Sequence, residues 1–145
     1  MLIVGNGHVI TRDAKNQYIP DGAVAMDGMK ICRVGQTAEI RRAFPDADFI
    51  DAKGGVIMPA FINTHEHIYS AMARGLNING YAPKGFLDIL DGLWWNIDRH
   101  LTNDLTYLSA METYVECIKN GVTTVFDHHA SFGEIKDSLF AIGQA

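Results

Sequence analysis

The sequence predicts an α/β protein in which a small β-rich segment, residues 1–55, precedes repeated strand–helix units in residues 56–145. Short strand-like segments broken by glycine turns fill the first part. In the second part, apolar runs at 56–67 and 122–126 each end in histidines and lead into a helical pattern. A repeated βα pattern closes as a doubly wound sheet or as a (β/α)8 barrel, and 145 residues complete neither.

The first part is expected to form an incomplete β-sandwich. Its strands are expected at residues 2–4, 22–26, 30–34 and 48–52. Asp27-Gly28 predicts a two-residue hairpin loop between the middle two strands. Thr37 is expected to cap one short helix through Ala43, which Pro45 ends. Four short strands leave their edges and one sheet face uncovered, so this part does not form a satisfactory sandwich alone.

The second part starts with a strand that is almost free of polar residues, and we expect it to be buried on both faces, as in a parallel sheet. A short helical pattern follows from Ile68 and ends at Gly75, which suits a left-handed stop. Residues 77–85 form the predicted loop, and an apolar helical face at 86–93 leads into the tryptophan pair 94–95.

The clearest helix is expected from Thr102, a good capping residue, to Asn120, with Gly121 as its stop. Its apolar stripe consists of Leu105, Leu108, Met111, Val115 and Ile118. The β-branched run 122–126 predicts a second buried strand, and the apolar spacing after it predicts a further helix over 135–142.

Composition excludes several classes of function. The formal charge of −5 and the lack of a basic cluster argue against a nucleic-acid surface. No basic leader and no apolar stretch of membrane-spanning length is evident, so we expect a soluble, cytoplasmic protein without membrane contact. Cys32 and Cys117 follow no metal or redox spacing and are expected to be reduced thiols.

The strongest chemical signal is the pair His65 and His67 at the end of the first buried run. Side chains alternate faces along a strand, so both imidazoles project to one side while Glu66 projects to the other. Two imidazoles on one face can hold a divalent metal, although two incidental histidines explain the spacing equally well. Reactive groups collect at the carboxyl ends of parallel strands, which favours the metal hypothesis.

His128 and His129 end the second run, close enough in a parallel sheet to complete such a site or to contact its substrate, or else to end a strand at the surface. His8 and His100 have no partners in the sequence and are expected to be structural. The residues argue against a metallo-β-lactamase-like site, because its motif needs aspartate and histidine where Tyr69 and Ser70 stand.

The run Met58-Pro-Ala-Phe-Ile-Asn-Thr-His-Glu-His67, the dipeptide Arg74-Gly75 and the run Gly121-Val-Thr-Thr-Val125 resemble the amidohydrolase superfamily. Asn63 before Thr-His is similar to the deaminase and chlorohydrolase branch, and residues 77–102 look most like its selenium-metabolism-linked aminohydrolases. The resemblance spans essentially the whole chain. It implies the amino-terminal part of a (β/α)8 TIM barrel, preceded by part of a β-sandwich to which both chain ends contribute.

The resemblance makes His65 and His67 the first two ligands of one divalent metal ion, zinc before iron, with the later ligands and the proton-shuttling glutamate outside this chain. His128, His129, Trp94 and Trp95 are the expected substrate-binding residues. A tryptophan pair is more often explained by core packing. Residues 95–102 resemble a Trp-Pro-x-Glu segment of the branch, but with Asn96 for proline and Asp98 for glutamate, which weakens the case for substrate contact by Asp98.

The predicted function is therefore that of an amino-terminal part of an aminohydrolase acting on non-peptide carbon–nitrogen bonds. A metal-activated hydroxide would deaminate a small nitrogen heterocycle. The isolated 145-residue chain is expected to be inactive, and the complete protein could be a homo-oligomer. The alternative is a non-catalytic split or degenerate module that binds a partner chain through its open sheet edge.

Overall fold

A computed structural model describes residues 1–15 and 18–145. The chain forms two compact units, residues 1–59 and 60–145, which are described separately. In the described residues, no helix has the length and hydrophobicity that crossing a membrane requires. The division falls four residues after the expected boundary, because Val56–Ile57 (β5) pairs with the first strand of the chain.

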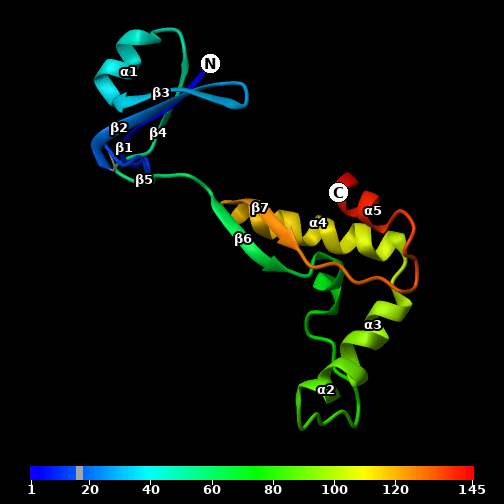
Figure 1. Cartoon of the computed structure of the whole chain (residues 1–145). Coiled ribbons are helices and arrows are strands. Elements are labelled where there is room, and N and C mark those ends of the chain that lie inside the picture. Colours follow the sequence, from blue (N-terminus) through cyan, green and yellow to red (C-terminus); the bar gives the residue numbers. More distant parts are fainter. Residues whose placement is uncertain (16–17) are drawn as a thin grey trace. The chain divides into compact units, whose positions relative to one another are not determined.

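The first unit is a five-stranded sheet with one short helix. Its elements are β1 (Leu2–Ile10), β2 (Tyr18–Asp27), β3 (Lys30–Gln36), α1 (Thr37–Ala43), β4 (Asp48–Asp51) and β5. The sheet order is β3-β2-β1-β4, with antiparallel pairing except that β4 and β5 both run parallel to β1, along different stretches of it. All four expected strands are present, and β1, β2 and β3 are longer than expected (Figure 1).

The helix α1 covers one face of this sheet, where Ile3, Ala23, Ala25 and Ile40 form the core. The opposite face carries an apolar groove of about 260 Å³ between the strands, lined by side chains such as Val24 and Val34. In the described residues one face of this sheet is covered and the opposite, apolar face is not. The incomplete β-sandwich stays a prediction.

Two local details of the first unit differ from the expectation. The hairpin loop is Gly28-Met29, because Asp27 still pairs with Lys30, and Gly28 takes the left-handed φ of 55°. Thr37 is the first helical residue and not the cap. Its hydroxyl accepts from the Asn6 amide and donates to the Asp21 carbonyl, so it ties the helix start to β1 and β2.

The second unit begins with β6 (Phe61–Glu66), which pairs in parallel with β7 (Val122–Asp127). Between them lie the 3₁₀ turn η1 (Ile68–Ala73), the helical stretch α2 (Phe86–Ile89), η2 (Leu90–Trp94) and α3 (Trp95–His100), and the long helix α4 (Asn103–Lys119). A last helix, α5 (Ser138–Gln144), follows β7 (Figure 1). The strand–histidine–helix order occurs twice, as expected.

The expected single strand 56–67 is broken at Met58, Pro59 and Ala60, so its two ends belong to different sheets. Burial on both faces is also not found: Phe61, Ile62 and Phe126 are 57%, 61% and 64% exposed. Only two strands form this sheet in the described chain, and two strands cannot cover both of their own faces.

Helix α4 has the expected ends. The Thr102 hydroxyl accepts from the Leu105 amide, and Gly121 takes a left-handed φ of 70° after the last turn. The expected core stripe, however, is exposed, and the buried residues are Thr106, Ser109, Ala110 and Thr113. Small side chains let the backbone of η1 approach closely, and the Met72 amide donates to the Ser109 hydroxyl.

Candidate metal centre

The strand ends bring the predicted residues together. Glu66 at the end of β6 pairs with Asp127 at the end of β7, and the His128 amide donates to the Glu66 carbonyl over 2.8 Å. The histidines that follow each strand therefore lie at one edge of the parallel sheet. This pairing places His128 beside His65 and His67, although His128 is about sixty residues from both in sequence.

His65 and His67 present converging nitrogens. Their Nε2 atoms lie 3.2 Å apart, and the rings meet edge to face with centroids separated by 5.1 Å. Two ligands of a tetrahedral zinc ion, each about 2.0–2.1 Å from it, have donor atoms about 3.3 Å apart. The distance between the two imidazoles therefore fits a shared metal ion.

The proton on His67 is fixed by the backbone. Nδ1 of His67 lies 2.8 Å from the His128 carbonyl oxygen, which can only accept, so Nδ1 donates. In the neutral ring the lone pair then lies on Nε2, the atom that faces His65. A hydrogen bond of this kind orients a histidine for metal binding before the metal arrives.

Asn63 and Glu66 hold the backbone of the pair. The Asn63 carboxamide donates to one Glu66 oxygen over 2.8 Å and accepts from the His65 amide over 3.2 Å. The other Glu66 oxygen accepts from the His67 amide over 3.0 Å. The Glu66 side chain thus lies on the opposite face of the strand from the two imidazoles, as the alternation predicts. Its carboxylate holds the backbone that carries them.

His128 contributes a ring to this cluster. It stacks on His65 with centroids 4.5 Å apart and an interplanar angle of 29°, and its centroid lies 5.8 Å from that of His67. Among the described residues, no group of three His, Cys, Asp or Glu side chains is arranged to hold a metal ion. The described residues thus form a two-ligand cluster with a third imidazole beside it.

His129 turns away from this cluster into a buried polar group. Its side chain is 14% exposed, and its ring meets Tyr69 edge-on at 5.4 Å. Tyr69 in turn bonds through its hydroxyl to Asp98, and these two residues are 5% and 4% exposed. Both ring nitrogens of His129 and Oδ1 of Asp98 are buried without a hydrogen-bond partner in the described chain.

Burial sets the ionisation of this group. Burial raises the pKa of Tyr69 to about 12, and the negative charge of Asp98 adds to that effect. Burial also raises the pKa of Asp98, although the Tyr69 hydrogen bond and His67 oppose it. It lowers the pKa of His129, against the attraction of Asp127 and Asp98. Neutral His129 and neutral Tyr69 are therefore the favoured forms near pH 7.

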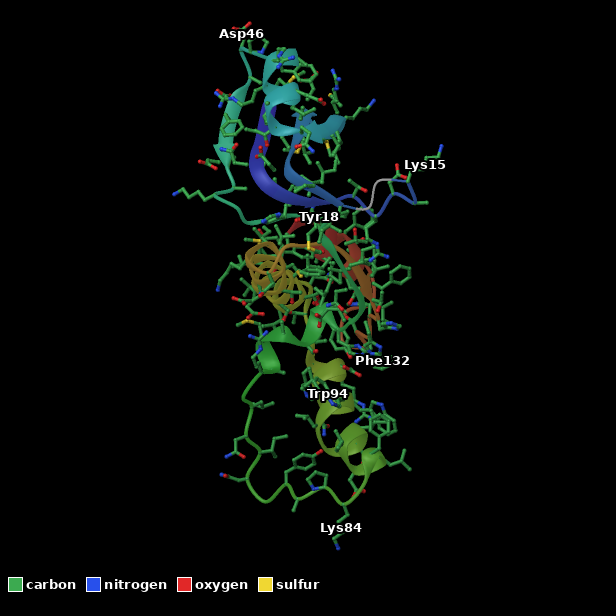
Figure 2. All side chains as sticks on the ribbon, turned by 90° about the vertical axis from the view of Figure 1, so that its left-hand side faces the viewer. Lys15, Tyr18, Asp46, Lys84, Trp94 and Phe132 are labelled. Atoms are coloured by element: carbon green, nitrogen blue, oxygen red, sulfur yellow. The ribbon has the colours of Figure 1, made fainter. Side chains whose placement is uncertain are left out.

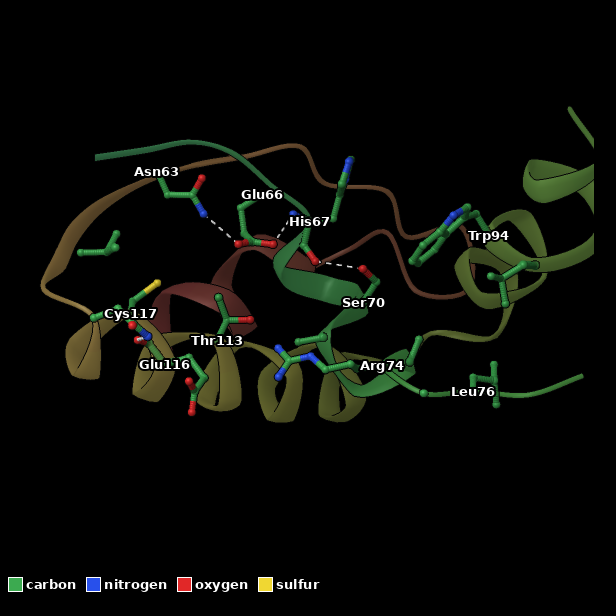
Figure 3. A pocket seen from close by; sticks show the side chains of 16 residues that line it. Asn63, Glu66, His67, Ser70, Arg74, Leu76, Trp94, Thr113, Glu116 and Cys117 are labelled. Carbon is green, nitrogen blue, oxygen red and sulfur yellow. Dashed lines mark hydrogen bonds between the residues drawn. The ribbon is translucent and has the colours of Figure 1, made fainter. Parts of the chain in front are cut away.

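A groove of about 590 Å³ lies on the other side of β6, between that strand, η1 and α4. Figure 3 shows Glu66, Arg74, Trp94 and Cys117 around it. His67 lines it as well, but its Nδ1 and Nε2 are directed to His128 and His65, so the groove does not coincide with the metal pair. Trp94 borders this groove, whereas Trp95 is 38% exposed and is not among the lining residues.

Sequence reasoning missed Tyr69 and Asp127 as members of the site. Tyr69 was expected only to lie in the short helical pattern that follows His67, and no role in the site was expected for Asp127. Asp127 accepts from the Ile68 amide over 2.9 Å and so fixes the start of η1 directly after the metal pair. The available signal was a carboxylate at the end of the second strand-like run, directly before His128. In the structure it pairs with Glu66.

Comparison with known proteins identifies the family. The amidohydrolase family matches residues 56–141, and an imidazolonepropionase-like composite domain of bacteria matches residues 22–47. The chain belongs to the amidohydrolase family, and its fold is that of the amino-terminal part of a TIM-barrel amidohydrolase. The expected family and fold class are thus confirmed.

Two curated relatives show the extent of the similarity. A 5'-deoxyadenosine deaminase of Methanococcoides burtonii is 31% identical over 98% of this chain. A 5-methylthioadenosine/S-adenosylhomocysteine deaminase of Syntrophus aciditrophicus is 31% identical over 87% of this chain. The chain spans 31% and 28% of these two relatives, respectively, which is about a third of their length.

Solved structures agree with this fold. A mutant of the atrazine chlorohydrolase TrzN from Arthrobacter aurescens TC1, complexed with zinc and atraton, is 25% identical and superposes with a TM-score of 0.81. The match covers 99% of this chain and 32% of TrzN. Escherichia coli guanine deaminase, at 20% identity, shares the fold with a TM-score of 0.79 over 100% of this chain and 34% of its own.

Proposed function

We propose that this chain supplies the first part of a metal-dependent aminohydrolase that deaminates a small nitrogen heterocycle. In this proposal His65 and His67 are two ligands of a single divalent metal ion, zinc before iron. The observation that carries the proposal is the 3.2 Å between their Nε2 atoms. The hydrogen bond from His67 Nδ1 to the His128 carbonyl leaves a free lone pair on one of these nitrogens.

The relatives support the class of reaction and of substrate. The curated relatives are named as deaminases of 5'-deoxyadenosine, 5-methylthioadenosine and S-adenosylhomocysteine, and TrzN was solved with zinc. All three named substrates carry an amino-substituted nitrogen heterocycle, which is the chemistry we propose here. The narrower likeness to selenium-linked aminohydrolases and a cytoplasmic location stay predictions.

Each residue of the cluster has a defined task in this proposal. His65 and His67 hold the metal, and Asn63 and Glu66 hold the loop that carries them. When bound, a divalent metal supplies a Lewis acid and lowers the pKa of a coordinated water. His128 stacks on His65 and so lies where a substrate must approach, which supports a contact between its ring and the substrate.

The other proposed substrate contacts have weaker structural support. His129 is largely buried against Tyr69, so any contact it makes with a substrate requires this group to open. Trp94 lies beside the groove on the opposite side of β6, and Trp95 is part of the helical stretch that follows. Their role as walls of a substrate site stays a prediction.

Metal content tests the proposal directly. Full-length protein purified without chelator is expected to contain one equivalent of zinc by inductively coupled plasma mass spectrometry. His65→Ala and His67→Ala should each lower this content well below one equivalent, because each removes a donor nitrogen. His100→Ala is the matched control, since His100 bonds to the Asn96 carbonyl away from the cluster, and it should retain the metal.

Ammonia release from 5'-deoxyadenosine, 5-methylthioadenosine and guanine measures the activity of the same proteins. Deamination that depends on His65 and His67 but not on His100 supports the proposal. Metal-free full-length protein whose activity is unchanged by His65→Ala would refute the metal hypothesis. Metal-free full-length protein that releases no ammonia from any of these substrates would favour the non-catalytic module that binds a partner chain. The isolated 145-residue chain is expected to bind zinc weakly and to release no ammonia, because the described residues offer only two ligands.

A further inference from the structure

The outer face of helix α4 carries an exposed apolar stripe that neither the fold nor the metal centre uses. The stripe consists of Leu105, Leu108, Met111, Val115 and Ile118, which are between 39% and 77% exposed. At 3.6 residues per turn its centre lies about 180° from the buried residues Thr106, Ser109, Ala110 and Thr113. The helix therefore presents polar and small residues to its own unit and large apolar ones outward.

The neighbouring elements lie on other sides of α4. Ala110 and Tyr114 face α5, where the Tyr114 hydroxyl donates to the Ile142 carbonyl. Thr113, Glu116 and Cys117 line the groove on the opposite flank. In the part of the chain that the structure describes, the elements that pack along either flank leave the outer stripe uncovered. Figure 1 shows α4 in this setting beside β7 and α5.

We propose that this outer stripe is a self-association surface, on which α4 of a second copy of the chain packs antiparallel. The spacing is the first reason. Leu108, Met111, Val115 and Ile118 follow one another at intervals of three, four and three residues. That alternation is the seam of a two-helix coiled coil, and a lone solvent-facing helix has no need of it.

The second reason is that the stripe is complementary to itself when reversed. A twofold axis passing between residues 111 and 112 places Leu105 opposite Ile118 of the second copy and Leu108 opposite Val115. The same axis places Asp104 opposite Lys119, so a negative and a positive charge meet at each end. A parallel pair would instead bring like charges together at both ends.

The residues near the axis are compatible with this arrangement. The same axis places Met111 of each copy opposite Glu112 of the other copy. The two Met111 side chains then lie on either side of the axis, where the flexible methionine side chain packs adaptably. Glu112 also lies near the axis, but Arg74 Nη1 lies 3.1 Å from its carboxylate and offsets its charge. Lys119 is 64% exposed and bonds to Glu116 on its own helix, from which its ammonium can also reach a facing carboxylate.

Cross-linking tests the register. In full-length protein carrying Cys32→Ser, which removes the exposed native thiol, Met111→Cys is expected to form an intermolecular disulfide on mild oxidation. Leu105→Cys should not, because in the antiparallel pair the two copies of residue 105 are about 20 Å apart along the helix axis. Equal cross-linking of both variants, or of neither, would overturn the proposal.

Sedimentation of the full-length protein tests the surface. The wild type is expected to be dimeric. Leu108→Glu with Val115→Glu should raise the dissociation constant at least about 100-fold, since burying two glutamates per copy costs more than about 2.7 kcal/mol. Leu87→Glu is the matched control, because Leu87 is 71% exposed but lies on α2, and it should remain dimeric.

A charge exchange keeps the test informative if the double glutamate variant fails to fold. Asp104→Lys and Lys119→Asp should each weaken the dimer about tenfold, and the two together should restore it. A dimer unaffected by these changes would use another surface. If the wild type is monomeric and the thiol of the Met111→Cys variant is protected from thiol reagents, another part of the same polypeptide covers the stripe. Either result would refute the proposal.

Discussion

Tyr69→Phe is expected to lower the free energy of unfolding of the full-length protein by about 1.5–3 kcal/mol at pH 7. Tyr69 and Asp98 are 5% and 4% exposed, and the Tyr69 hydroxyl donates to the Asp98 carboxylate. Oδ1 of Asp98 has no partner among the described residues. Loss of the Tyr69 hydroxyl therefore removes the hydrogen bond that the Asp98 carboxylate makes within this buried group. Phenylalanine keeps the ring contacts with His67 and His129, which isolates the effect of the bond.

Urea unfolding followed by fluorescence measures the change, and a double-mutant cycle assigns it to the pair. In an Asp98→Asn background the bond joins two neutral groups, so Tyr69→Phe should cost only about 0.5–1.5 kcal/mol. The coupling energy is then about 1 kcal/mol. Tyr107→Phe, on the exposed side of α4, is the control and should change stability by less than about 0.5 kcal/mol.

The dependence on pH gives a second check. Burial raises the pKa of Asp98 in the folded protein, so the contribution of this carboxyl to stability is fully present below its unfolded pKa, about 3.9, and is lost as the pH rises through its folded pKa. The cost of Tyr69→Phe should fall as the pH is lowered toward about 4. An equal cost in the wild-type and Asp98→Asn backgrounds would show that Asp98 is not the partner that matters.

Three further outcomes follow from the second unit. Ala110→Leu should destabilise by about 1–3 kcal/mol in urea unfolding, because Ala110 is 0% exposed in the core of α4 and has no room for three more carbons. Gly121→Ala should cost about 1–2 kcal/mol because φ is +70° there, whereas Gly143→Ala within α5 should be neutral or stabilising; equal effects would contradict the strain argument. Burial lowers the pKa of His129 below 6.5, so its contribution to stability is present above that pH and is lost as the pH falls through 6.5 and below. His129→Asn should therefore lose less stability than the wild type between about pH 7.5 and pH 5.5 in thermal unfolding, and an unchanged pH profile would exclude this role.

Much of the local structure could be predicted because it depends on neighbouring residues alone. Thr102 caps α4 through its own hydroxyl, and Gly121 ends the helix with a left-handed backbone. The alternation along β6 placed His65 and His67 on one side and Glu66 on the other. The boundary between the two compact units at Pro59 could not be predicted in this way, because it depends on the pairing of Val56–Ile57 with β1.

The candidate site was predicted in part for the same reason. The spacing of His65 and His67 is a local property of one strand, and the structure brings their Nε2 atoms together. The behaviour of His128 and His129 depends on how β7 leaves the sheet. Adjacent residues point to opposite sides there, so the His128 ring stacks on His65 and the His129 ring is buried against Tyr69.

The sequence by itself determined the βα order, the histidine pair and the ends of the long helix, because period, caps and turn residues act over a few positions. Only the tertiary structure decided which face of α4 is buried. Hydrophobicity favoured the stripe from Leu105 to Ile118, but close approach of η1 requires small side chains and selected the face of Ser109 and Ala110. Tertiary packing likewise buried Asp98 against Tyr69, since these two positions are distant in sequence and meet only in the folded chain. Figure 2 shows the side chains on the ribbon, with Trp94 labelled.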